Sequence, residues 1–204
     1  MKILSFDTSG EILSIAVFDD EKKMASFESS GFVRHSSILL ASIQKLLAGK
    51  KIKPGQIDVI AVGLGPGSFT GLRVGVTAAK VLAYALKKKI VGVSSLDAVA
   101  SGMADAEGVF TLALDARRQK YYIAVYQRKA GHLLKVRKLK LEDEKKLTRE
   151  KNVIKTGDGT RLHPKAEFIA RLALEDIKRN KFTDPFQLEP VYLYPRDCNV
   201  TKKK

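Results

Sequence analysis

The sequence has one cysteine, no tryptophan and no long uninterrupted apolar segment. Cys198 has no second cysteine to pair with, which excludes an internal disulfide framework and is typical of a reducing compartment. The start, Met1-Lys2-Ile3, runs directly into a strand pattern without the apolar region of a secretory signal. The most apolar helix contains Arg73 and Lys80 and falls short of the roughly 20 apolar residues of a membrane span. We therefore expect a cytoplasmic protein with no membrane segment.

Charge is plentiful but unevenly placed. Apolar residues make up 45% of the 204 residues, enough for a core, and the net charge is +15. Residues 1–115 hold 13 Lys/Arg and 11 Asp/Glu, a net +2, whereas residues 116–204 hold 24 and 11, a net +13. The excess predicts either a surface for nucleic acid or an acidic partner, or a solvated lysine-rich surface. The sequence leaves both interpretations open.

A glycine-rich turn joins a predicted strand to a predicted apolar helix. The strand is Ile57–Val62, and the turn and helix follow from Gly63 to Tyr84. This order points the free N–H groups of the helix at whatever lies over the turn, which suits an anion. The helix also carries a ridge of small residues, which would let another helix approach closely. The ridge consists of Gly71, Gly75, Ala79 and Ala83.

The common nucleotide and hydrolase motifs do not match this turn. A P-loop needs Gly-Lys-Ser/Thr at its end, which is missing. In the dinucleotide fingerprint the third glycine would fall on Ser68, and a hydrolase elbow would need glycines where Pro66 and Thr70 stand. A strand-to-helix turn without a ligand therefore remains the simpler interpretation.

The first half of the chain predicts three strands followed by alternating helices and strands. The strands of the expected antiparallel meander are Lys2–Asp7, Ile12–Asp19 and Lys22–Glu28. A helix is expected from about Arg34 to Ala48, with Gly49 at its C-cap. A short strand at Ile90–Val93 precedes a helix that Ser94 or Ser95 caps and that ends near Gly102.

The pattern then restarts, which predicts two tandem units. A strand ending in Asp115 and a strand containing Ile123-Ala-Val125 mirror the strand ending in Asp7 and the later Ile15-Ala-Val17. We expect five further elements after them: a third strand at Leu133–Leu139, a helix near Glu142–Arg149, a strand at Asn152–Thr156, the turn Gly157–Gly159 and a helix from about Pro164 to Arg179. Two βββαβα units of the RNase H type resemble the α/β fold shared by actin, Hsp70 chaperones and sugar kinases (the ASKHA fold). We expect units at 1–102 and 103–204, the second reduced and basic.

With these motifs assembled, the chain resembles the TsaB family, also called YeaZ. The resemblance covers essentially the whole chain, and the Gly-Pro-Gly-Ser-Phe-Thr-Gly run is its most specific motif. Near the end, Tyr194-Pro195-Arg196 stands where the family has an arginine directly after Tyr-Leu. The residues that carry the resemblance are Phe6–Ser9, Ser14–Val17, His35-Ser36, Leu39-Leu40, Gly65–Gly75, Ser94–Leu96, Asp115–Arg117, Gly157–Gly159 and Glu189–Leu193.

The resemblance implies a non-catalytic accessory subunit of bacterial tRNA threonylcarbamoyladenosine synthesis. Its enzymatic relative TsaD transfers a threonylcarbamoyl group to N6 of adenosine 37 and holds a metal through two histidines spaced i, i+4 on the first helix. Here His35 would be the first ligand, but position 39 is leucine. His132 and His163 lack that spacing. We therefore expect neither a metal site nor a catalytic residue.

The aspartates that end the first strand of each unit are candidates for a nucleotide site. In active kinases of this fold such carboxylates bind a Mg²⁺-nucleotide. The sequence leaves open a vestigial cofactor pocket at Asp7, Thr8 and Ser9, lined also by Ser5 and Gly10, or a purely structural turn. ATP or ADP at the interface of a complex remains compatible with either.

Three hypotheses follow for function. The first is a scaffold that docks onto TsaD, works with TsaC and TsaE in the pathway, and forms a homodimer when alone. The second is a small kinase or ATPase of the actin-like fold, and the third is a tRNA-holding module that uses residues 116–204. Expected phosphate contacts include Arg117, Arg118, Lys120, Arg128, Lys135, Arg137 and Lys138. The expected subunit interface is Leu39, Leu40, Ile43 and Leu47 with the ridge Gly71, Gly75, Ala79 and Ala83.

Overall fold

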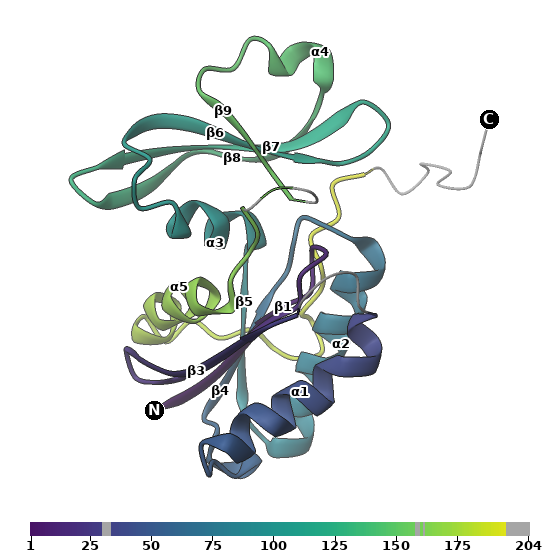
Figure 1. The fold of residues 1–204 in the computed structure, drawn as a ribbon, viewed down its shortest axis with the longest axis vertical. Coiled ribbons are helices and arrows are strands. Elements are labelled where there is room, and N and C mark those ends of the chain that lie inside the picture. Colours follow the sequence, from purple (N-terminus) through teal and green to yellow (C-terminus); the bar gives the residue numbers. More distant parts are fainter. Residues whose placement is uncertain (30–33, 158–159, 161, 195–204) are drawn as a thin grey trace.

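Two β-sheets of matching strand order make up the fold (Figure 1). The computed structural model describes residues 1–29, 34–157, 160 and 162–194. The first sheet has the order β3-β2-β1-β4-β5, built from β1 (Lys2–Asp7), β2 (Ser14–Asp19), β3 (Lys22–Glu28), β4 (Val59–Gly63) and β5 (Lys89–Val93). The second has the order β8-β7-β6-β9, built from β6 (Gly108–Asp115), β7 (Lys120–Lys129), β8 (His132–Asp143) and β9 (Val153–Thr156).

The strand order confirms the predicted tandem repeat and its reduced second unit. In both sheets an antiparallel meander is extended by a parallel strand, β4 beside β1 and β9 beside β6. The second sheet has no counterpart of β5 in the described residues. The helices are α1 (His35–Gly49), the 3₁₀ turn η1 (Pro54–Gln56), α2 (Phe69–Leu86), α3 (Ser95–Gly102), α4 (Glu144–Leu147) and α5 (Ala166–Lys178).

Most predicted elements end within two residues of their observed bounds, and α4 is the main exception. The expected helix near Glu142–Arg149 is a single turn, because β8 continues to Asp143. The expected turn at Gly157–Gly159 lies partly outside the described residues.

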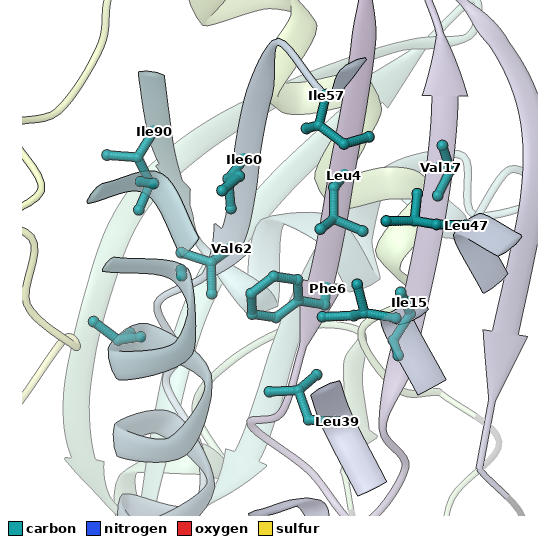
Figure 2. Close-up of a cluster of buried hydrophobic side chains, with 14 of the residues drawn as sticks. Leu4, Phe6, Ile15, Val17, Leu39, Leu47, Ile57, Ile60, Val62 and Ile90 are labelled. Atoms are coloured by element: carbon teal, nitrogen blue, oxygen red, sulfur yellow. The ribbon is translucent and has the colours of Figure 1, made fainter. Parts of the chain in front are cut away.

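The larger core lies between the first sheet and the helices α1 and α2 (Figure 2). Leu4 and Phe6 of β1 and Ile15 of β2 point toward Leu39 and Leu47 of α1, and all five side chains are buried. Burying one such side chain stabilises the fold by about 1.5–3 kcal/mol. This packing fixes the two helices side by side on one face of the sheet.

The opposite face of the first sheet is covered by α5, which comes from the second unit. Ile3, Phe18 and Val59 on the sheet pack against Ile169 and Ala173 of α5. The expected unit boundary at residue 102 therefore does not divide the chain into two separately packed cores. The helix α5 follows the second sheet in sequence but packs on the first sheet.

The helix α3 makes the reverse exchange and covers one face of the second sheet. Leu96 and Val99 of α3 pack against Phe110, Leu112 and Tyr126. On the other face, the described residues provide only α4, whose Leu147 contacts Ala113 and Ile123. The second sheet is thus covered on one side and largely open on the other (Figure 1).

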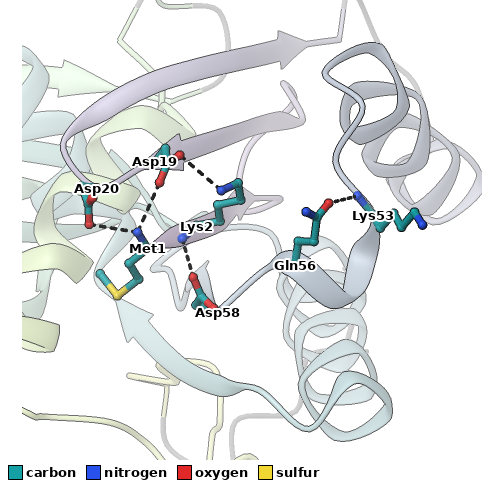
Figure 3. A network of polar contacts seen from close by, with 7 residues as sticks. All are labelled: Met1, Lys2, Asp19, Asp20, Lys53, Gln56 and Asp58. Carbon is teal, nitrogen blue, oxygen red and sulfur yellow. Dashed lines mark hydrogen bonds and ion pairs between the residues drawn. The ribbon is translucent and has the colours of Figure 1, made fainter.

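Polar contacts tie together the end of the first sheet that lies far from the second sheet (Figure 3). The backbone N–H of Lys2 donates to Asp58 Oδ2 at 2.7 Å, and its ammonium donates to Asp19 Oδ2 at 3.3 Å. The N–H of Lys53 donates to Gln56 Oε1 at 2.8 Å and closes the turn before β4. Such exposed contacts contribute at most about 1 kcal/mol each, so they align strand ends rather than hold the core.

The helix α2 has the length and composition of a membrane span, with 18 residues and a mean hydropathy of 1.2, and a third of it is buried inside the protein. The core helix of a globular protein meets the same criteria. Here the buried face of α2 includes Val76 and Ala83 and packs on β4.

Candidate functional site

The glycine-rich segment fits closely around the first turn of the chain. Four of its glycines recur every four residues from the end of β4 into α2, and each of these faces the turn at Asp7–Ser9. A Cβ added at Gly63 would lie 1.8 Å from Asp7 Oδ2, and one added at Gly67 would lie 2.3 Å from the Ser9 carbonyl oxygen. A Cβ added at Gly71 would lie 2.1 Å from the Thr8 carbonyl oxygen, and one added at Gly75 would lie 2.2 Å from Thr8 Oγ1. Because these distances leave no room for a side chain, the motif serves packing against the chain's own first turn.

Asp7 is completely buried, and both of its carboxylate oxygens are engaged. Oδ1 accepts hydrogen bonds from the N–H of Ser9 at 2.7 Å and from its hydroxyl at 2.6 Å. Oδ2 accepts one from the Ser95 hydroxyl at 2.6 Å. Burial raises the pKa of Asp7, while the hydrogen bonds from Ser9 and Ser95 and the nearby His35 oppose that rise. The carboxylate acts as a bridge between the first turn and α3.

Asp7 and Thr8, two of the three residues expected to form a vestigial cofactor pocket, are withdrawn into the fold, whereas Ser9 borders the cleft between the units. The Thr8 hydroxyl donates to the Gly71 carbonyl at 2.7 Å, and Thr8 is fully buried. The Ser5 hydroxyl donates to the Ala166 carbonyl at 2.8 Å. These polar atoms are used inside the fold, which favours the structural turn, one of the two interpretations that the sequence left open.

The equivalent turn of the second unit is open. Asp115 Oδ1 accepts a hydrogen bond from the N–H of Arg117 at 2.7 Å, the same local bond that Asp7 makes with Ser9. The Asp115 side chain is 51% exposed. Arg117, Arg118 and Gln119 all have positive φ values, a conformation that costs about 1–3 kcal/mol per residue and needs support from its surroundings.

A cleft of about 1530 Å³ lies between the two units. The turns after β1 and before α2 line it from one side, and the β6–β7 turn lines it from the other. The C-terminal segment 189–194 runs along it, where the Tyr194 hydroxyl donates to the carbonyl oxygens of Ala116 at 2.8 Å and Arg117 at 3.1 Å. The cleft is large enough for a nucleotide, but Asp7 does not point into it with a free oxygen.

The histidines lie apart. His35 Nε2 is 3.0 Å from the Glu11 carbonyl oxygen, and the residue one turn later, Leu39, is buried in the core. His163 Nε2 is 3.2 Å from Glu28 Oε1. In the part of the chain that the structure describes, no group of three or more His, Cys, Asp or Glu residues is placed to hold a metal ion.

The expected subunit interface is largely buried within the chain itself. The α1 residues Leu39, Ile43 and Leu47 pack on the sheet, and the ridge Gly71, Gly75, Ala79 and Ala83 lies against it and the first turn. Of the eight predicted positions only Leu40 is exposed, at 58%. The other seven positions are not available as docking residues, because packing within the chain already covers them.

The outer faces of α1 and α2 carry different apolar residues, which sequence reasoning missed. Val81 and Tyr84 of α2 are 59% and 72% exposed. Tyr84 meets the exposed Phe186 ring edge-on, with ring centroids 6.1 Å apart. At the start of α2, Phe69 packs on Tyr192 with centroids 5.5 Å apart. Helical periodicity could have predicted their exposure, since Val81 and Tyr84 lie on the side of α2 opposite the ridge.

Comparisons with known proteins agree with these features. The sequence model of the family described as "TsaD: tRNA N6-adenosine threonylcarbamoyltransferase" matches residues 28–187. The tRNA threonylcarbamoyladenosine biosynthesis protein TsaB of Bacillus subtilis (strain 168) is 35% identical over 168 residues, covering 80% of this chain and 73% of that protein. TsaB of Escherichia coli (strain K12) is 36% identical over 130 residues, covering 63% of this chain and 56% of that protein.

The fold also matches a solved structure over nearly its whole length. YeaZ from Pseudomonas aeruginosa superimposes with a TM-score of 0.80 at 25% identity, covering 94% of this chain and 99% of that one. The match with the second TsaB relative spans little more than half of that protein's length. The chain therefore belongs to the TsaB family, also called YeaZ, of tRNA threonylcarbamoyladenosine biosynthesis proteins.

Proposed function

We propose that the chain is a non-catalytic subunit that docks onto TsaD through the outer faces of α1 and α2 and is required for threonylcarbamoyl transfer to tRNA. The observation that carries the proposal is the exposed apolar surface of these two helices. We call it the docking face, and it consists of Leu40, Ala41, Gln44 and Ala48 of α1 with Thr77, Val81, Tyr84 and Ala85 of α2.

The docking face is uncharged, which favours contact with another apolar surface. After Arg73, every exposed side chain of α2 is uncharged, since Lys80 is half-buried and donates to the carbonyl oxygens of Phe186 and Leu188. On α1, Lys45 is the exposed charge beside this face. Exposed large apolar side chains such as Leu40, Val81 and Tyr84 on two neighbouring helices are typical of protein–protein interfaces.

A helix pair of the same shape is the most suitable occupant. A two-fold axis places a surface against its own copy, so two such chains would form a four-helix contact as a homodimer. The family model named for TsaD matches residues 28–187, a range that includes both helices. TsaD would then present a similar pair, and homodimer and heterodimer would compete for one surface.

The kinase or ATPase alternative has less support. Its metal-binding carboxylate would be Asp7, whose oxygens are occupied by Ser9 and Ser95. The cleft between the units leaves room for ATP or ADP in an assembled complex. Such a nucleotide would contact the turns that line the cleft rather than Asp7.

Reconstitution of the modification tests the proposal. Purified TsaC, TsaD and TsaE should modify tRNA only when this chain is added, and the chain alone should not hydrolyse ATP above background. ATP turnover by the chain alone that disappears in Asp7→Ala would overturn the proposal in favour of a kinase-like enzyme.

A further inference from the structure

We propose that the open face of the second sheet binds the phosphate backbone of tRNA. The inference rests on the proposed function for the identity of the RNA, but it concerns a different surface from the docking face. We call it the outer basic face, and its exposed cations are Lys138, Lys145, Arg149 and Lys151.

This face is available because, among the described residues, the single turn α4 is the only helix that covers it. The first sheet lies between α1 and α2 on one face and α5 on the other. The second sheet has α3 on one face, while in the described residues the other face meets only the single turn α4 and the segment after it. That uncovered side points away from the first sheet (Figure 1).

The region is strongly basic after its internal ion pairs are counted. Residues 135–155 contain nine Lys/Arg and four Asp/Glu, a net +5. Each acid already has a partner in the fold. Glu142 pairs with Lys140 and Lys146, Asp143 with Lys120, Glu144 with the Tyr121 hydroxyl and Glu150 with Arg137. Three of the four acids are thus paired with other cations, and Glu144 has only the neutral Tyr121 hydroxyl as its partner.

The remaining cations gather around one contact. The guanidinium of Arg137 on β8 donates to Glu150 in the segment after α4. Lys138 follows Arg137 in β8, and Arg149 and Lys151 flank Glu150, so this contact places the backbone positions of the three cations near one another. Among the described residues none of the three forms an ion pair with a carboxylate.

Protection of an edge strand explains only part of this charge. β8 lies at the edge of its sheet, where lysines commonly prevent pairing with another chain. That role accounts for Lys138. It does not account for Arg149 and Lys151, which lie in the segment between α4 and β9.

An RNA backbone is the partner that this surface suits best. The relatives act in tRNA modification by their names, and phosphates are the dense negative charge that an uncompensated cation cluster attracts. The exposed aromatic side chains of the described residues are Phe69, Tyr84, Phe186 and Tyr192, all on or beside α2. On the side of the second sheet that α4 covers, Tyr121 is half-buried and Lys155 Nζ lies 5.1 Å from its ring centroid. We therefore expect contacts with phosphate that are independent of sequence.

The structure also corrects the list of phosphate contacts expected from the sequence. Arg128 is buried, and its guanidinium donates to the carbonyl oxygens of Gly131 and Ala100. Lys135 is paired with Asp97 at 2.7 Å, and Arg137 with Glu150. Lys138 is the position from that list that belongs to the outer basic face.

Salt-dependent binding tests the proposal on the full chain. Anisotropy of a fluorescent unmodified tRNA transcript should be measured between 50 and 200 mM KCl with the wild type and with a variant in which Lys138, Lys145, Arg149 and Lys151 are all changed to alanine. Each lost phosphate contact lowers the log–log salt slope by about 0.7–0.9, so the variant should lose a slope of about 3. Its affinity should fall about tenfold or more at low salt.

A matched control removes the same charge elsewhere. Lys22, Lys45, Lys50 and Lys53 are exposed and lie at the end of the first sheet that is remote from the second sheet. Their fourfold alanine variant should keep the wild-type slope. Equal losses in the two variants, no tRNA binding by the wild type, or equal competition by poly-glutamate would overturn the assignment to RNA.

Two further readouts separate this inference from docking and from misfolding. Double variants Lys138→Ala with Lys151→Ala, and Lys145→Ala with Arg149→Ala, should each lose about half of the slope while retaining the wild-type melting temperature. Capture of TsaD should be unaffected in all of them. If the wild type fails to capture TsaD but the slopes change as stated, docking is refuted while tRNA binding stands.

Discussion

At the scale of single residues, the first turn of the chain depends on the absence of side chains around it. Thr8 contacts Gly71 through its carbonyl oxygen and Gly75 through its hydroxyl. An added methyl group at Gly71 would meet a backbone atom, which cannot move aside as a flexible side chain can. Gly71→Ala should therefore destabilise the protein by about 1–3 kcal/mol in urea unfolding.

Gly49→Ala is the control for this substitution. Gly49 is the last residue of α1, and nothing lies within 4 Å of an added Cβ. The change should be neutral or slightly stabilising, since alanine favours a helix more than glycine does. Equal effects at Gly71 and Gly49 would show that the closeness of Thr8 does not prevent a side chain at position 71.

Asp7 provides a second prediction at this scale, through pH. Because burial raises the pKa of Asp7 above its ordinary 3.8, the native state holds the proton more tightly than the unfolded state does. The Asp7 contribution to stability is thus fully present below pH 3.8 and is lost as pH rises through the native pKa. Asp7→Asn removes this titration, so the variant should gain stability relative to the wild type as pH rises.

Urea unfolding of both proteins from pH 3.5 to 7 measures this difference. Asparagine has nearly the same shape, and it can still accept from Ser9 and donate to the Ser95 hydroxyl. A wild type that gains stability over Asp7→Asn with rising pH would show that hydrogen bonds outweigh burial at this carboxylate.

The same residues show what the sequence could predict about the site. The motif from Gly63 to Gly75 indicated either an anion cradle or a packing surface, and composition could not decide between them. The decision depends on Thr8, which lies more than 60 residues away in sequence and fills the space that the glycines leave. Likewise, Ser95 gave no sequence signal as the partner of Asp7, because only the fold brings them together.

At the scale of elements, α3 is joined to the second sheet by a polar contact at its first turn. The Tyr126 hydroxyl donates to Asp97 Oδ1 at 2.6 Å, and the Lys135 ammonium donates to the same oxygen at 2.7 Å. Burial and the charge of Asp97 raise the pKa of Tyr126, so this hydroxyl stays protonated. Asp97→Ala would leave it buried without its acceptor, at a cost of about 1–3 kcal/mol.

A double-mutant cycle separates this bond from other roles of Asp97. Tyr126→Phe combined with Asp97→Ala should cost less than the sum of the single changes, because both remove the same bond. Asp105→Ala in the exposed loop after α3 should change stability by no more than about 0.5 kcal/mol. Additive single effects would mean that Asp97 acts only at the start of the helix.

Element types followed from the sequence more reliably than their partners did. Alternating runs marked the strands and Ser94 marked the start of α3, whose first turn it caps by accepting from the Asp97 N–H. The sequence did not show that α3 and α5 would each cover the other unit's sheet, since both helices are amphipathic in the same way. The sequence likewise did not show which face of α2 would pack inside the chain. The helix buries the small residues of the ridge, which we expected at a subunit interface, and exposes Val81 and Tyr84.

At the scale of the whole molecule, the exchange of helices joins the two units and leaves two different surfaces exposed. The docking face belongs to the first unit and is uncharged, whereas the outer basic face belongs to the second, in a region that carries part of the charge excess. Because the two surfaces lie on different units, the proposed protein partner and the proposed RNA would not compete for one surface.

Sedimentation analysis of docking-face variants tests the central claim most directly. Leu40→Glu and Val81→Glu place a charge on α1 and α2 at exposed positions, and Leu134→Glu, at a position 63% exposed on β8, is the matched control. With folds verified by circular dichroism, the first two variants should be monomeric and fail to capture TsaD, while the wild type and Leu134→Glu should dimerise and capture it. A folded Val81→Glu variant that still dimerises and still binds TsaD would contradict the account.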